Sequence, residues 1–136
     1  MNAEQLQKTL VASQYAEQVL NLYQTQLEQD YCKDQFLQSL STESIHEKVQ
    51  QAVADVTDEH AWMKALRVLR AKLMFRWIWQ DANQLTNVVT LTRELSDFAD
   101  ASICAAKAFA LPPLLAKHGE PIGYSGHLQD LIVIGM

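Results

Sequence analysis

Residues 62–81 constrain the fold more than any other stretch, because they predict one helix that other elements must cover on several sides. At about 100° per residue, one face of this helix carries large apolar side chains: Trp62, Leu66, Leu69, Leu73 and Trp77. In the second half, further apolar residues occupy the rest of the circumference: Met74, Phe75, Ile78 and Trp79. A helix that is apolar all round has to be buried. The first half therefore predicts a surface helix, and the second half predicts the centre of a bundle.

Other helices are predicted on both sides of this stretch, and neither glycine nor proline occurs before Pro112. Residues 3–28 predict an amphipathic helix with a break near Ser13, and residues 34–40 predict a short helical turn. Ser41 or Thr42 opens the next helix, with one apolar stripe: Ile45, Val49, Ala52, Val53 and Val56. Thr57 or Asp58 is suited to cap the central helix, because its side-chain oxygen can accept a free backbone N–H.

After a polar break at 83–86, apolar residues at steps of three and four predict a long helix that runs to about Leu111. Its expected inward stripe is Val88, Leu91, Leu95, Phe98, Ser102 or Ile103, Ala106 and Phe109. Pro112 and Pro113 are expected to end or sharply kink this helix. A last turn through Lys117 should stop at His118–Gly119, since glycine suits the left-handed cap.

The C-terminal residues have a different character. Residues 120–127 predict a loop, and residues 128–134 predict a β-strand covered on both faces. No other stretch offers this strand a partner, and an isolated strand leaves its backbone polar groups unpaired. We therefore expect an all-α bundle of four to six helices over residues 1–119. Residues 120–136 would be a loop and the first strand of a sheet whose remainder is missing, as in a piece of a longer protein.

Composition narrows the class of protein. The formal net charge of −5 argues against a nucleic acid partner. No stretch was expected to reach the roughly 18 apolar residues that span a bilayer, and the N-terminus lacks the apolar core of a signal peptide. Cys32 and Cys104 are expected to be reduced thiols. These features predict a cytoplasmic, helix-rich protein with no membrane partner.

Candidate sites are few. The four histidines and two cysteines lack the spacing of metal ligands, so no metal site is predicted; the histidines are His46, His60, His118 and His127. Residues 123–127 resemble a hydrolase nucleophile elbow, but His127 stands where that motif needs glycine, and the strand follows instead of preceding. The carboxylates at helical spacing, Glu94, Asp97 and Asp100, suggest no cleft. No catalytic residue is therefore predicted.

One basic cluster stands out on the central helix: Lys64, Arg67, Arg70, Lys72 and Arg76. It is either a solvated face or a surface that docks on an acidic partner, and Lys72 and Arg76 lie apart from the other three on the helix. Arg76 falls within the apolar half, where a charge needs a buried partner. The three tryptophans of this helix are expected to be core residues.

Three segments together resemble the glutamine synthetase adenylyltransferase family. Residues 66–81, LRVLRAKLMFRWIWQD, resemble its LRxxRRxxMxRIAWRD helix, and residues 95–100, LSDFAD, resemble its LSxLAD segment. Residues 131–136, LIVIGM, resemble the strand that leads into its GMGKLGG turn. They occur in family order between about residue 61 and the end. The departures are Ala71, where the family tends to have arginine, and Trp77 and Ile78 within the RIAW run.

The resemblance implies a two-headed regulatory enzyme. One nucleotidyltransferase domain removes AMP from a tyrosine of glutamine synthetase, a second adds it from ATP, and the PII protein and glutamine select between them. This chain would be the helical lead-in to the N-terminal, deadenylylating head. Gly135 would begin the turn that contacts nucleotide phosphate, and the aspartates that bind magnesium would follow Met136. The chain alone would then hold no cofactor and would not be catalytic.

The residues also leave a second interpretation open. The chain could be a stand-alone helical interaction domain that forms a homodimer through its apolar central helix. A small enzyme would require convergent groups in a cleft, which the spacing does not suggest.

Overall fold

The computed structural model describes residues 2–32 and 36–133, and most of these lie in five α-helices. The helices are α1 (Ala3–Ala12), α2 (Gln14–Cys32), α3 (Thr42–Val53), α4 (Glu59–Ala82) and α5 (Val88–His118). The prediction of an all-helical bundle is confirmed for this part of the chain. The chain divides within α5 into two compact units, Met1–Ser102 and Ile103–Met136.

The helices of the first unit begin and end at the residues that their capping chemistry favours. The Asp58 carboxylate accepts the backbone N–H of Ala61 at 2.8 Å at the start of α4, and Ser41 accepts that of Ser44 at 3.2 Å at the start of α3. Ser13 has an extended backbone and separates α1 from α2, as predicted. A second interruption at Tyr23, where φ is −131°, was not predicted and divides α2 internally.

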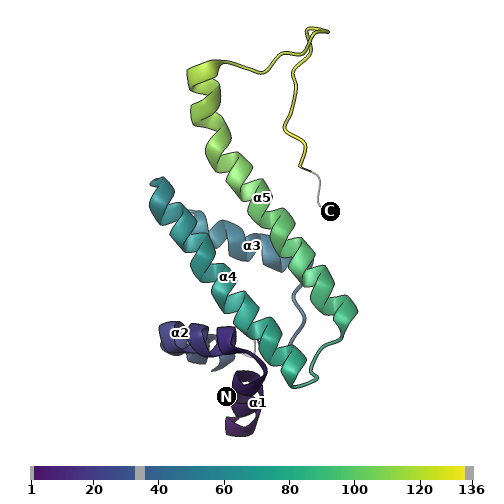
Figure 1. Ribbon diagram of the computed structural model, residues 1–136. Helices are drawn as coiled ribbons and strands as arrows, with labels where there is room; N and C mark the ends of the chain where they lie inside the picture. Colours follow the sequence, from purple (N-terminus) through teal and green to yellow (C-terminus); the bar gives the residue numbers. More distant parts are fainter. Residues whose placement is uncertain (1, 33–35, 134–136) are drawn as a thin grey trace. The chain divides into compact units, whose positions relative to one another are not determined.

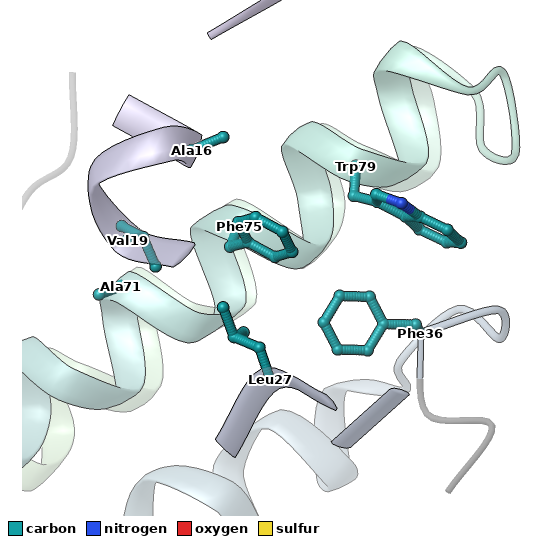
Figure 2. Packing of buried hydrophobic residues seen from close by; sticks show 7 residues of the cluster. All are labelled: Ala16, Val19, Leu27, Phe36, Ala71, Phe75 and Trp79. Carbon is teal, nitrogen blue, oxygen red and sulfur yellow. The ribbon is translucent and has the colours of Figure 1, made fainter. Parts of the chain in front are cut away.

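The core of the first unit forms where α2 packs against the second half of α4 (Figure 2). Its buried residues come from α2, the 36–41 connection and α4: Ala16, Val19, Leu27, Phe36, Ala71, Phe75 and Trp79. The Phe36 ring lies 5.7 Å from that of Trp79 and 6.1 Å from that of Phe75, both in edge-to-face geometry. The buried second half of the central helix is therefore confirmed.

The remaining helices of this unit also contact α4. In Figure 1, α3 lies beside α4, while α1 and α2 lie toward its C-terminal half. Asn83, which follows α4, donates its side-chain amide to the carbonyl of Gln5 and the hydroxyl of Thr9 in α1. The residues 88–102 of α5 then return alongside α4, where the Phe98 ring lies 6.0 Å from that of Trp77. α4 is thus the central element of the first unit.

The predicted inward stripe of α5 is only partly correct. Phe98 is buried as predicted, but Val88, Ile103 and Ala106 are exposed, and the other buried positions are Glu94, Ala101 and Ala105. Glu94 lies on the inward face, where its carboxylate accepts from Arg76, Trp77 and the backbone of Leu40, and an apolar pattern cannot identify such a charged position. Alanines carry too little apolar surface to decide the face by themselves.

Pro112 and Pro113 do not end α5, which continues to His118. The fixed φ of proline is compatible with helical backbone, although each proline removes one hydrogen bond donor. The predicted glycine cap is confirmed: Gly119 has φ of +78°, and its N–H donates to the carbonyl of Leu115 at 2.8 Å.

The strand predicted for 128–134 is not confirmed. Ile122 and Leu128 form an isolated antiparallel bridge around the turn at Gly123–Gly126, and residues 129–133 are exposed without strand structure. Among the described residues no second strand is present to pair with this segment, so its backbone groups do not form the hydrogen bonds of a β-sheet. Ile134, and with it the end of the predicted strand, lies outside the described residues. Residues 34–35 of the predicted 34–40 helical turn also lie outside the described residues, and its residues 36–38 form a non-helical turn.

By length and composition alone, α5 could cross a bilayer, since one of its 18-residue windows reaches a mean hydropathy of 1.3. Charged residues such as Asp100 and Lys107 interrupt the apolar sequence of α5, so this finding does not contradict the expectation that no uninterrupted run of about 18 apolar residues is present.

Candidate functional site

The buried carboxylate of Glu94 accepts hydrogen bonds from three different residues. It lies on the inward face of α5 and is 1% exposed. One oxygen, Oε2, accepts from Nη1 of Arg76 and from Nε1 of Trp77, both at 2.8 Å. The other, Oε1, accepts the backbone N–H of Leu40 at 2.8 Å. Glu94 therefore joins α4, α5 and the 36–41 connection at one point.

Arg76 supplies the opposite charge and extends the same network. Its side chain is 5% exposed, and Nη2 donates to the backbone carbonyl of Gln38. Next along this helix, Gln80 donates to the carbonyl of Phe36 at 2.6 Å, and from α5 Arg93 donates to the carbonyl of Leu40 at 2.9 Å. The connection between α2 and α3 is thus fixed by side chains of α4 and α5.

This arrangement can stabilise the fold but is poorly suited to proton transfer. Both oxygens of Glu94 already accept strong hydrogen bonds, two of them from neutral N–H groups and one from the arginine charge. A general base needs a free lone pair within reach of a substrate proton. The prediction that Arg76 requires a buried partner is confirmed, and that partner is Glu94.

The other predicted candidates do not converge on Glu94. Asp97 accepts from the hydroxyl of Thr42 at 2.9 Å, and Asp100 is exposed. Within residues 2–32 and 36–133, no three histidine, cysteine or acidic side chains are placed to hold a metal ion. Cys104 is a free, exposed thiol. Gly135, the predicted start of a phosphate-contacting turn, lies outside the described residues.

The basic cluster of α4 is divided, as the helical wheel predicts. Lys64, Arg67 and Arg70 are exposed on one side. On the other side, Lys72 lies 3.4 Å from Asp30 of α2, and Arg76 is buried against Glu94. The three tryptophans, Trp62, Trp77 and Trp79, are all buried, which confirms their assignment to the core.

A groove of about 290 Å³ opens beside this buried pair, between α2, α3, α4 and the 36–41 connection. Its walls include Phe36, Leu40, Leu69 and Leu73, and its charged lining consists of Asp30, Lys48, Lys72 and Arg76. Sequence reasoning did not find this groove. Its lining comes from four separate segments, and only the fold brings them together.

Two exposed carboxylates have lowered pKa values. The Lys107 ammonium, 2.6 Å from Asp130 in the second unit, holds the pKa of Asp130 below its ordinary value, helped by the N–H of Leu131. A hydrogen bond from its own backbone amide, with a smaller one from Ser41, lowers the pKa of Glu43 at the start of α3. Both effects stabilise local structure and neither defines a reactive centre.

Sequence reasoning also missed the link between Arg76 and Glu94, although a signal was present. Each is a charged residue within an otherwise apolar helical face, and the two have opposite signs. Such a pair of exceptions on two helices predicts that the helices pack with the charges together.

These observations define a helical scaffold whose buried charges hold helices and a connection in place. Comparison with protein families matches residues 3–136 to the glutamate-ammonia ligase adenylyltransferase family. The chain is 69% identical, over all of its 136 residues, to the bifunctional glutamine synthetase adenylyltransferase/adenylyl-removing enzyme of Acinetobacter baylyi, of which it covers 15%. It is 35% identical over 89 residues, 65% of its length, to the enzyme of the same name from Thioalkalivibrio sulfidiphilus, of which it covers 9%. No solved structure matches the chain.

The chain therefore belongs to the glutamate-ammonia ligase adenylyltransferase family. The three segments on which the resemblance was based lie within the matched residues. The chain spans about 15% of the length of the relative from Acinetobacter baylyi.

Proposed function

We propose that this chain is the helical lead-in to the deadenylylating head of a bifunctional adenylyltransferase/adenylyl-removing enzyme. In this role it is a scaffold and is not catalytic alone. The single observation that carries the scaffold role is the Glu94 network, in which a buried ion pair fixes α4, α5 and the 36–41 connection. Because the Glu94 carboxylate and the Arg76 guanidinium are hydrogen-bonded to each other within this network, neither would be available to act on a substrate.

The exposed tail supports a continuation into a nucleotidyltransferase sheet. Apolar side chains follow one another along it with little burial: Leu128, Leu131, Ile132 and Val133. A segment this apolar gains stability when another part of a protein covers it. Under the proposal, the following strands of the head cover it, and Gly135 opens the phosphate-contacting turn.

The partners and cofactors follow from the same proposal. The names of the relatives identify glutamine synthetase as their target, and we propose the same target for the protein that contains this chain. We also propose regulation by the PII protein, use of magnesium and ATP or AMP, and a cytoplasmic location. Under this proposal, magnesium and nucleotide are held by residues that follow Met136.

The coding sequence downstream of Met136 tests this proposal at little cost. We expect it to continue with Gly-Lys-Leu-Gly-Gly, which completes the GMGKLGG turn, and then to encode an Asp-x-Asp pair on the next predicted strand. A stop codon directly after Met136, or a continuation without either motif, would contradict the proposal.

One observation favours a second candidate, a stand-alone interaction domain that dimerises. The exposed apolar tail offers a surface that a second copy could bury. The central helix is a poor choice for that interface, because Phe75, Trp77 and Trp79 are buried within their own chain. Sedimentation equilibrium distinguishes the two: the lead-in proposal predicts a monomer once the remaining sheet is present, and the alternative predicts a dimer that persists.

A further inference from the structure

The first half of α4 carries an exposed basic face, which consists of Lys64, Arg67 and Arg70. Within residues 2–32 and 36–133, none of these three side chains forms an ion pair or a hydrogen bond. No acidic residue stands three or four positions before or after any of them in the sequence. The chain has 16 acidic and 11 basic residues, so the gap does not reflect a shortage of carboxylates.

This arrangement lowers the stability of the helix. Like charges at a spacing of three residues lie side by side on a helix and repel one another. The other two cations of α4 are compensated, because Lys72 lies 3.4 Å from Asp30 and Arg76 pairs with the buried Glu94. A local charge pattern that costs stability and gains nothing within its own chain is typical of a functional surface.

The position of the basic face leaves it open to a partner. In Figure 1, α1 and α2 lie toward the C-terminal half of α4, whereas these three residues belong to the first half. Met63, one helical turn before Arg67, is 37% exposed. Arginine and methionine are both enriched in protein–protein interfaces, and the flexible methionine side chain adapts to different contacts.

The spacing of the three cations favours a helix as the partner. They form a row at steps of three residues, and such a row packs between rows at steps of four on a second helix, with the two axes crossing at about 20°. The row extends about 9 Å along the axis of α4, and three carboxylates at steps of four extend about 12 Å. The long side chains of lysine and arginine can cover this difference, and arginine can bind a carboxylate through two parallel hydrogen bonds.

The surrounding charge argues against a polyphosphate as the partner. Asp58 and Glu59 are exposed at the start of the same helix, and the chain as a whole has a formal net charge of −5. A nucleic acid or an anionic membrane presents closely spaced charges that these carboxylates would repel. Discrete carboxylates on a protein helix can instead meet the three cations alone.

We propose that the basic face of α4 docks an acidic helix of a protein partner. Carboxylates at steps of four on that helix would pair with Lys64, Arg67 and Arg70. This surface goes beyond the proposed function, and it would stand if the chain had a different enzymatic context.

The test is an amide ¹H–¹⁵N NMR titration of the chain with three helical, alanine-rich peptides. The row peptide has glutamates at i, i+4 and i+8, the spread peptide has them at i, i+2 and i+5, and the neutral peptide has glutamine in their place. The row peptide should cause saturable shifts of the amides of Lys64, Arg67 and Arg70. The spread and neutral peptides should bind about tenfold more weakly, the loss expected from three exposed ion pairs.

Two further titrations identify the interaction. An increase in ionic strength from about 0.05 M to about 0.3 M should weaken binding of the row peptide several-fold, because salt screens exposed charges. A short oligothymidylate carries phosphates in place of carboxylates and should bind these amides more weakly than the row peptide.

Variants assign the binding to the basic face. Arg67→Gln and, separately, Arg70→Gln should each weaken binding of the row peptide by about two- to fivefold. Lys8→Gln is the matched control, because it removes one exposed positive charge from α1 in the same unit, and it should leave binding unchanged. All of these positions are exposed, and the dispersion of each spectrum reports that the variant is folded.

Any of three results would overturn the proposal. The first is the absence of saturable shifts at the three amides with the row peptide. The second is binding of the spread peptide, the neutral peptide or the oligothymidylate as tight as that of the row peptide. The third is equal binding of the row peptide by folded Arg67→Gln, Arg70→Gln and Lys8→Gln variants.

Discussion

Replacement of Glu94 by alanine should be among the most damaging single substitutions in the chain. It would leave the Arg76 guanidinium buried without a countercharge, and it would leave the N–H groups of Leu40 and Trp77 without an acceptor. Removal of one partner from a buried ion pair costs about 3–5 kcal/mol. We therefore expect the free energy of unfolding of the first unit to fall by about this amount, a large part of the total for a domain of this size.

The matched variants separate charge from shape. Glu94→Gln keeps a carbonyl oxygen for the N–H donors but not the charge, so it should cost less than Glu94→Ala, about 2 kcal/mol. Asp100→Ala removes an exposed carboxylate from the same helix and should change stability by less than about 0.5 kcal/mol. A double variant, Arg76→Met with Glu94→Leu, removes both charges and should be more stable than Glu94→Ala alone.

Urea unfolding followed by tryptophan fluorescence measures these effects, because Trp77 contacts Glu94 directly. With a slope of about 1–3 kcal/mol per molar urea, the midpoint for Glu94→Ala should fall by more than about 1 M. A loss below about 1 kcal/mol, or a double variant no more stable than Glu94→Ala, would refute the reasoning that the pair holds the unit together.

Three further predictions concern separate parts of the chain. Trp79→Ala should cost about 3–5 kcal/mol in the same urea assay, because a fully buried indole would leave a cavity beside Phe36; a cost below about 1 kcal/mol would contradict the assigned core. Gly119→Ala should lower the free energy of unfolding by about 1 kcal/mol, because the cap needs φ of +78°, although no atom crowds the added Cβ. An unchanged midpoint of thermal unfolding would contradict that backbone conformation. The lowered pKa of Asp130 means that its contact with Lys107 contributes above the ordinary value of 3.8 and is lost as pH falls through the folded-state pKa. An NMR titration of the Asp130 carboxyl should therefore show the pKa return toward 3.8 in Lys107→Gln, and an identical titration in both proteins would rule out the contact.

Local signals in the sequence are sufficient to predict where α3 and α4 begin. The oxygens of Ser41 and Asp58 satisfy backbone donors of their own helices, so each start depends only on residues close in sequence. The second half of α4 is apolar on every side, so its burial follows from its sequence alone.

The inward face of α5 and the groove could not be predicted in the same way. The position of Glu94 depends on Arg76, Trp77 and the backbone of Leu40, which lie 17 to 54 residues away in sequence. The groove likewise requires Asp30, Lys48 and Lys72 to meet from three helices. The strand expected at 128–134 needs backbone partners that the described residues do not supply, so its sequence preference alone does not produce a strand.

The central claim is that this chain is a scaffold for chemistry performed by residues that follow it. The most direct measurement is the formation of ADP from adenylylated glutamine synthetase and phosphate, with magnesium present. The chain should form none, whereas a longer polypeptide that includes the Gly-rich turn and the Asp-x-Asp pair should transfer the adenylyl group to phosphate and form ADP. Formation of ADP by residues 1–136 alone would contradict the scaffold role.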